Sequence, residues 1–221
     1  MTHVHTFAFN PFSENTYVVY DDSQECIIID PGCYTDSERE QLSNFISQHQ
    51  LTPVRLINTH CHIDHVFGNR YVAEKYGLDL EIHEGELPVL AAVATVAQMY
   101  GIPNVQQSPD PNPAHYLQEG MTIDFGNSTL KILLTPGHSP ASVSFYCAAS
   151  NFVLGGDVLF QGSIGRTDLP GGDYNTLMQS IEREFMALPD ATVVYSGHGA
   201  PTTVGAERQS NPFILEYNKN K

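Results

Sequence analysis

The fold is decided by the stretch Val54-Arg55-Leu56-Ile57-Asn58-Thr59-His60-Cys61-His62-Ile63-Asp64-His65. Its first five residues are mostly apolar and predict a short buried strand. The last six residues hold three histidines and one aspartate. We expect them on the loop after that strand, where open α/β sheets place their ligand sites. Imidazole and carboxylate groups at this density indicate a site for a divalent metal ion, with zinc as the first candidate.

Three more polar clusters follow short apolar segments further along the chain. They are Thr135-Pro136-Gly137-His138, Gly155-Gly156-Asp157 and Ser196-Gly197-His198-Gly199. If the strands before them run alongside one another, all four clusters converge at one end of the sheets. Together they supply five histidines and two aspartates. That is too many for one tetrahedral ion, but it suits two ions that share a carboxylate.

The spacing also predicts how the ligands divide between the ions. Alternation along an extended segment points residues 60, 62 and 64 one way, while residue 65 can turn aside. We therefore assign the first ion to His60, His62 and His138, the second to Asp64, His65 and His198, and the bridge to Asp157. Two ions about 3.5–4 Å apart generate a metal-bound hydroxide at neutral pH, which attacks a carbonyl carbon. Asp64 is the catalytic side chain expected beside that hydroxide, and iron or manganese are alternatives to zinc.

Composition limits the class of protein. The chain has 221 residues, of which 41% are hydrophobic, and a formal net charge of −15. This acidity disfavours nucleic acid or an anionic membrane as a partner, so we expect a small-molecule substrate; the oligomeric state is left open. The four cysteines (Cys26, Cys33, Cys61 and Cys147) lack C-x-x-C spacing and are expected as reduced thiols. With no signal peptide or membrane segment apparent, the expected location is cytoplasmic.

Hydrophobic periodicity predicts an α+β fold. Strand patterns are expected at 3–9, 16–20, 26–29, 54–58, 80–83, 121–125, 130–134, 143–147, 152–155 and 192–195, and helices at 35–49, 66–76, 86–100, 175–188 and 205–210. The strands come in meander-like runs and helices cap each half, which favours two mixed sheets packed face to face with helices outside. We expect one domain at 1–212 and a polar, frayed tail at 213–221.

The motifs resemble those of the metallo-β-lactamase superfamily. The series Thr-His-x-His-x-Asp-His, Thr-Pro-Gly-His, Gly-Gly-Asp and Ser-Gly-His-Gly is similar to that of the glyoxalase II-like hydrolases (hydroxyacylglutathione hydrolases). The run from Gly156 to Asp173 is similar to the compact bacterial branch of that family. The resemblance implies an αββα sandwich and a two-metal site with the ligand roles given above. It also places Arg166 and Tyr195 near the cleft, as candidate substrate-binding residues.

Leaving-group chemistry favours a thioester as the substrate. A thiol has a pKa of about 8.5, so a thiolate departs with little help from a general acid. We therefore expect hydrolysis of a thioester, and the resemblance implies one of the S-acylglutathione type. A lactone or ester hydrolase on the same site stays open, as does a persulfide dioxygenase that holds one iron with His60, His138 and Asp157. A metal-stabilised binding module is a weaker alternative.

One further residue is expected to support the ligands. Asp30, in Asp30-Pro31-Gly32, is placed to hydrogen-bond a ligand histidine from behind. Its alternative role is to stabilise the turn that Pro31 and Gly32 form.

Overall fold

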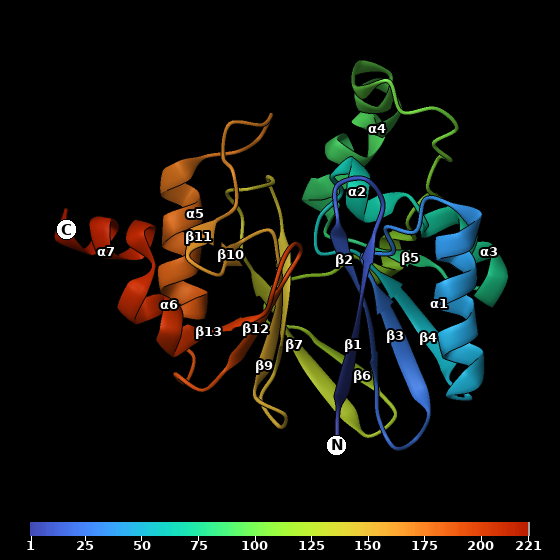
Figure 1. The fold of residues 1–221 in the computed structure, drawn as a ribbon, viewed down its shortest axis with the longest axis horizontal. Helices are drawn as coiled ribbons and strands as arrows, with labels where there is room; N and C mark the ends of the chain where they lie inside the picture. The colour runs from blue at the N-terminus through green and yellow to red at the C-terminus, as the bar shows by residue number, and fades with distance from the viewer. Residues whose placement is uncertain (221) are drawn as a thin grey trace.

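The computed structural model describes residues 1–220 and is a four-layer sandwich (Figure 1). The first sheet has the order β1-β2-β3-β4-β5 and the second has the order β13-β12-β9-β8-β7-β6. The strands of the first sheet are β1 (His3–Phe9), β2 (Glu14–Tyr20), β3 (Glu25–Ile29), β4 (Thr52–Ile57) and β5 (Leu80–Glu81). The strands of the second sheet are β6 (Thr122–Phe125), β7 (Ser128–Leu134), β8 (Val143–Cys147), β9 (Phe152–Gly156), β12 (Val193–Ser196) and β13 (Thr202–Thr203).

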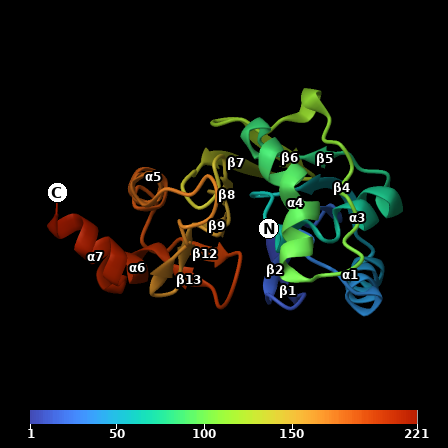
Figure 2. The same ribbon diagram turned by 90° about the horizontal axis from the view of Figure 1, so that it is seen from above.

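Helices cover the outer face of each sheet (Figures 1 and 2). Those beside the first sheet are α1 (Asp36–Gln48), α2 (Ile63–Val66), α3 (Asn69–Tyr76), the short 3₁₀ turn η1 (Glu84–Glu86) and α4 (Leu87–Tyr100). Those beside the second sheet are α5 (Tyr174–Ser180), the π-helical turn η3 (Ile181–Phe185), α6 (Val204–Ser210) and α7 (Pro212–Lys219). The remaining elements are the 3₁₀ turn η2 (Pro113–His115) and the strand pair β10 (Leu159–Phe160) and β11 (Ser163–Ile164). The expected αββα architecture is confirmed.

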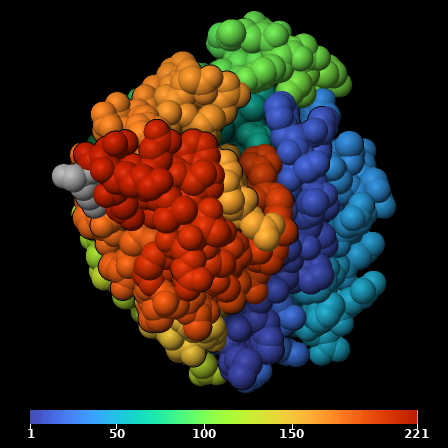
Figure 3. Space-filling model, turned by 60° about the vertical axis from the view of Figure 1, so that its left-hand side comes forward, coloured from blue at the N-terminus to red at the C-terminus, as the bar shows by residue number. Residues whose placement is uncertain are grey.

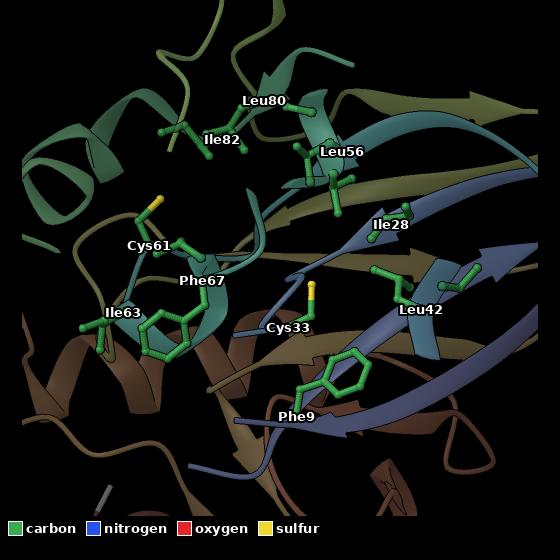
Figure 4. Packing of buried hydrophobic residues seen from close by; sticks show 14 of the residues in the cluster. Phe9, Ile28, Cys33, Leu42, Leu56, Cys61, Ile63, Phe67, Leu80 and Ile82 are labelled. Atoms are coloured by element: carbon green, nitrogen blue, oxygen red, sulfur yellow. The ribbon is translucent and has the colours of Figure 1, made fainter. Parts of the chain in front are cut away.

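Side-chain alternation divides the core into three layers. In β3, Ile28 belongs to the cluster between the first sheet and its helices, whereas Ile27 and Ile29 belong to the cluster between the sheets. Figure 4 shows the first of these clusters, in which Phe9, Ile28 and Leu42 lie close together. A third cluster packs the second sheet against α5, α6 and α7. Fully apolar strands such as β3 are therefore buried on both faces.

Strand direction brings the polar clusters to one edge. β3 runs parallel to β4 in the first sheet, and β9 runs parallel to β12 in the second. β7 has the same direction as β9, because each pairs antiparallel with β8. The segments that follow β3, β4, β7, β9 and β12 consequently emerge at the same end of the sandwich.

Two predicted helices differ from the structure. The helix expected at 66–76 is interrupted before Asn69, where Gly68 N donates to Pro31 O at 2.7 Å; this close approach requires glycine, since a Cβ there would lie 2.4 Å from Cys33 Sγ. The tail expected to fray after Phe213 instead forms α7 within the described residues. Asn211 caps α7, Pro212 fits its first turn, and Ile214 is 1% exposed against the third core cluster. None of the helices within residues 1–220 combines the length and hydropathy needed to cross a membrane.

Asp21 ties the two sheets together at the end opposite the polar clusters. Its carboxylate, 4% exposed, accepts hydrogen bonds from Ser23 and from the β6–β7 hairpin at Asn127 N and Ser128 Oγ, both at 2.7 Å. Burial raises its pKa, but the hydrogen bonds from Ser23 and Ser128 outweigh burial and lower the pKa to about 2.

This carboxylate should make stability fall in acid. A group whose pKa is lower in the folded state stabilises the fold above its unfolded pKa of about 3.9, and that stability is lost as the pH falls towards 2. We expect Asp21→Asn to lower the free energy of unfolding by about 1–3 kcal/mol at pH 7, because buried donors lose their acceptor. The deficit should shrink between pH 4 and pH 2 in urea titrations. A deficit independent of pH would show that the charge of Asp21 is irrelevant.

Candidate metal centre

The structure brings all seven predicted ligand side chains together at the end of the sandwich. His60 and His62 follow β4, Asp64 and His65 lie in α2, and His138, Asp157 and His198 follow β7, β9 and β12. In Figure 3, α4 (green), the orange segment before α5 and the blue β1–β2 turn surround a recess at this end, with the teal segment after β4 visible inside it.

The donor atoms fall into the two sets expected from the spacing. Ligand atoms of His60, His62 and His138 lie within 4.8 Å of one another, and so do those of Asp64, His65 and His198. In the first set, His62 Nδ1 is 2.8 Å from His138 Nε2. In the second set, His198 Nε2 is 3.1 Å from Asp64 Oδ2. A further group joins Asp30 to His60 and His65.

Asp157 lies between the two sets. Its Oδ2 is 3.5 Å from His138 Nε2 of the first set and 3.5 Å from His198 Nε2 of the second, and its Oδ1 is 3.5 Å from His65 Nε2. Gly197 makes this position possible, because a Cβ there would lie 2.0 Å from Asp157 Oδ1. The glycine of the Ser-Gly-His-Gly motif therefore leaves room for the carboxylate.

Unsatisfied polar atoms show that the donor set fits metal ions. His60 Nε2, His65 Nε2 and Asp157 Oδ1 are buried and have no hydrogen-bond partner. Burying such atoms without a partner is costly, so an arrangement that leaves three of them facing one region requires another binding partner. Imidazole nitrogens and carboxylate oxygens suit a first-row divalent cation.

The other ring nitrogens of the first-set histidines are held by neighbouring oxygens. His138 Nδ1 is 2.7 Å from Arg166 O, a backbone carbonyl that only accepts hydrogen bonds. His60 Nδ1 is 3.0 Å from Thr59 Oγ1, whose hydroxyl donates to Asp30 Oδ2 at 2.6 Å. These contacts place a proton on Nδ1 of both rings and leave Nε2 as the metal-binding atom.

The second-set histidines are oriented in the same way. His198 Nδ1 donates to Phe12 O at 3.1 Å, and His65 Nδ1 donates to Asp30 Oδ2 at 3.2 Å. The hypothesis that Asp30 lies behind a ligand histidine therefore agrees with its contacts. Asp30 also accepts hydrogen bonds from Thr59 N and from the Asn58 amide, so it joins the end of β3 to the histidine loop after β4.

Electrostatics separates the two sets. Burial, followed by repulsion from neighbouring histidines, lowers the pKa of His60, and the same causes lower the pKa of His62 to about 3. Burial also acts to lower the pKa of His65, but Asp64 and Asp157 outweigh it and raise that pKa. Glu14, at 3.8 Å, is a further carboxylate beside the His65 ring. The electrostatic potential is therefore more negative at the second set than at the first, and it favours a positive charge there more strongly.

Asn15 fastens the two sheets together beside the site. Its amide donates to Ser196 O and Gly199 O at 2.9 Å each, and its backbone N–H donates to Gly197 O at 2.7 Å. The loop that carries His198 is therefore tied to β2 of the opposite sheet. This contact holds His198 on the side of the first sheet, from which Asp64 and His65 of the same donor set come.

The two candidate substrate-binding side chains lie outside the donor cluster. Arg166 is exposed and forms a bidentate ion pair with Asp168, at 2.7 and 2.8 Å. Only its backbone carbonyl contacts the site, through His138. Tyr195 lies in β12, half-buried, with its ring 5.8 Å from the ring of Tyr17 in the core between the sheets. Within residues 1–220, neither side chain hydrogen-bonds to or stacks on one of the seven candidate ligands, so a role in substrate binding stays a prediction.

Two buried glutamates near the site were not predicted from the sequence. Glu14 begins β2 and is fully buried, and burial raises its pKa. Glu86 is also fully buried, between η1 and α4. Each has the sequence context of an ordinary surface acid, at a strand start or in the first turn of a helix. The residues next to them in the sequence do not distinguish either glutamate from such a surface acid.

The fold and the paired donor sets define a class of protein, and a family comparison agrees. The family model of the metallo-beta-lactamase superfamily matches residues 9–198. The chain therefore belongs to the metallo-β-lactamase superfamily.

Relatives and solved structures resemble the chain over nearly its whole length. The probable metallo-hydrolase YqgX of Bacillus subtilis is 39% identical, and the hydroxyacylglutathione hydrolase GloC of Haemophilus influenzae is 36% identical. Each match covers 92% of this chain and 93% of the relative. The structure of BLEG-1 B3 metallo-beta-lactamase has a TM-score of 0.86 at 36% identity, covering 96% of this chain and 99% of that one. The structure of TTHA1623 in a di-iron-bound form has a TM-score of 0.85 at 36% identity, covering 95% and 100%.

Proposed function

We propose that this superfamily member is a dinuclear metal-dependent hydrolase that cleaves small thioesters. The observation that carries the proposal is the position of Asp157 between two complete sets of three donors. A mononuclear iron site of His60, His138 and Asp157 would leave Asp64, His65 and His198 without a role. The di-iron form of TTHA1623 supports two ions. Zinc is the proposed metal, with iron or manganese as alternatives.

The chain's residues prepare the site for hydrolysis. Two divalent ions supply, when bound, a water that is ionised near neutral pH and positive charge for a developing oxyanion. The backbone carbonyls of Phe12 and Arg166 and the carboxylate of Asp30 hold the histidine rings so that their free nitrogens converge. Asp64, with 9% exposure, lies 3.1 Å from His198 Nε2, where its carboxylate would help hold the second ion and would orient the nucleophile.

Of the candidate substrate classes, a thioester needs the least protonation of its leaving group by these residues. The ion pairs of Asp64 and Asp157 within residues 1–220 involve only histidines. No lysine or arginine among the described residues is therefore placed there to protonate an alkoxide or amine, whereas a thiolate departs unaided. The name of the relative GloC, a hydroxyacylglutathione hydrolase, supports an S-acylglutathione type of substrate.

Hydrolysis of S-lactoylglutathione by the metal-loaded protein tests this function. We expect turnover by the wild type and a loss of at least about 100-fold in kcat/KM in Asp64→Ala, because that variant loses a ligand that also orients the nucleophile. Asp124→Asn, on the distant β6–β7 hairpin, is the control and should retain full activity.

Other substrates decide between the alternatives. An N-acetylcysteamine thioester tests whether the glutathione portion is needed, and a lactone and a cephalosporin test the other carbonyl substrates. Turnover of the lactone or the cephalosporin without turnover of either thioester would contradict the proposal. Oxygen uptake with a persulfide, together with one iron per chain, would instead identify a dioxygenase.

A further inference from the structure

Glu86 cross-links the two loops that carry the first donor set. Its carboxylate is 0% exposed and accepts hydrogen bonds from Cys61 N at 3.0 Å and from Ala141 N at 2.8 Å. The Ser139 hydroxyl lies 2.8 and 2.7 Å from its two oxygens. All three partners are donors, which suits a group that offers only acceptor oxygens.

The three donors flank the expected ligands directly. Cys61 lies between His60 and His62, and Ser139 follows His138. One side chain therefore ties the segment after β4 to the segment after β7. A backbone bond also joins the two segments, because Val143 N at the start of β8 donates to Thr59 O, beside His60, at 2.8 Å.

Close packing of η1 against the second loop makes this cross-link possible. A Cβ on Gly85 would lie 2.6 Å from Ala141 Cβ, so a glycine is needed at the contact. η1 is also fixed by its own cap, because His83 Nδ1 accepts a hydrogen bond from Gly85 N at 3.0 Å. Glu86 is therefore held at a defined distance from both loops.

We propose that Glu86 is a positioning residue that sets the spacing between His60, His62 and His138 and so determines the affinity of the first metal ion. The inference rests on the proposed assignment of those histidines as one ligand set. Glu86 touches no ligand ring in the hydrogen-bond network; it acts through the backbone on either side of the ligands. Supporting residues of this kind typically change metal affinity by about 10–100-fold.

The Glu86→Gln variant removes one acceptor oxygen and introduces an amide N–H that faces a donor. Its effect is measured by chelator competition in the Asp64→Ala background, where the first set alone is complete. We expect the affinity of the remaining zinc ion to fall by about 10–100-fold relative to Asp64→Ala alone. In a His138→Ala background, where the second set is complete, Glu86→Gln should change zinc affinity by less than about twofold. The visible spectrum of a cobalt-substituted first site should also change.

Glu207→Gln is the matched control. Glu207 is 1% exposed and likewise accepts three hydrogen bonds, from Gly162 N, Thr202 Oγ1 and Asn211 Nδ2. It joins the loop between β10 and β11 to α6 and no ligand loop, so its loss should lower the melting temperature without weakening the first ion. An equal loss of zinc affinity in Glu207→Gln would overturn the positioning role, because general destabilisation would then explain both variants.

Two milder variants decide the question if Glu86→Gln does not fold. Gly85→Ala moves η1 away from Ala141, and Ser139→Ala removes one donor while Glu86 stays intact. Each should weaken the first ion by about 3–10-fold in the Asp64→Ala background, less than the 10–100-fold of a lost supporting residue, because Glu86 itself is kept. Unchanged affinity in these variants, or in a folded Glu86→Gln, would overturn the inference, as would absence of zinc binding by the wild type. Failure of the thioester assay alone would not, because every readout here is metal binding.

Discussion

Asp157→Asn should abolish hydrolysis and lower the affinity of both ions. The carboxylate lies 3.5 Å from one histidine of the first set and 3.5 Å from two histidines of the second. An amide carries no charge and offers one acceptor oxygen instead of two, so the shared ligand and the negative charge between the cations are lost together. We expect kcat/KM to fall at least about 1,000-fold, and bound zinc to fall from about two ions per chain to one or fewer after dialysis.

A control variant and a contradicting result can both be stated for Asp157→Asn. Asp124→Asn makes the same chemical change on the β6–β7 hairpin and should keep both ions. Without metal, Asp157→Asn should be less stable than the wild type at pH 7, because the histidines around this carboxylate outweigh its burial and lower its pKa, so its charge stabilises the fold. Retention of two tightly bound ions in Asp157→Asn would contradict the assignment of this residue as the bridge.

Asp30→Asn should weaken the second ion while leaving the fold intact. Asp30 has a φ of +49°, a conformation that asparagine tolerates better than most residues, so little backbone strain is added. The new amide still accepts from Thr59 N, but its NH₂ group then faces His65 Nδ1, where the carboxylate oxygen stood at 3.2 Å. The ring is driven to the other tautomer, with its proton on the metal-binding Nε2.

We expect a 10–100-fold loss of affinity for the second ion, measured by chelator competition, and a similar loss of kcat. Asp30→Ala serves for comparison, because it removes the acceptor of Thr59 N and of the Thr59 hydroxyl and places alanine at a positive φ. That variant should lose about 3–5 kcal/mol of stability. Equal zinc affinity in Asp30→Asn and the wild type would show that Asp30 only stabilises the turn at Pro31.

Local rules were sufficient for the fold and the donor clusters. The apolar side chains of β2 and β3 point alternately into the two core clusters on either side of the first sheet. Parallel pairing of β3 with β4 then brings the ends of these two strands together. The division of His60, His62, Asp64 and His65 between two sets was predicted, but its cause differs from the extended path that was expected: α2 begins at Ile63 and turns the last two away from the first two.

The residues that were missed depend on contacts between distant segments. Glu86 is separated by 25 and 55 residues from its partners Cys61 and Ala141, so nothing in its neighbourhood indicates burial. The ion pair between the Arg166 guanidinium and Asp168 could be anticipated from the sequence. The contact between the backbone carbonyl of Arg166 and His138 could not. The helical signal at Asn211-Pro212, a capping residue followed by proline, was present and was overlooked.

The most direct measurement of the central claim is metal content of the purified protein, determined by elemental analysis against protein concentration. Two ions per chain are predicted for the wild type, falling to about one in Asp64→Ala and remaining at two in Asp124→Asn. A single ion per chain in the wild type, unaffected by loss of Asp64, would contradict the dinuclear site.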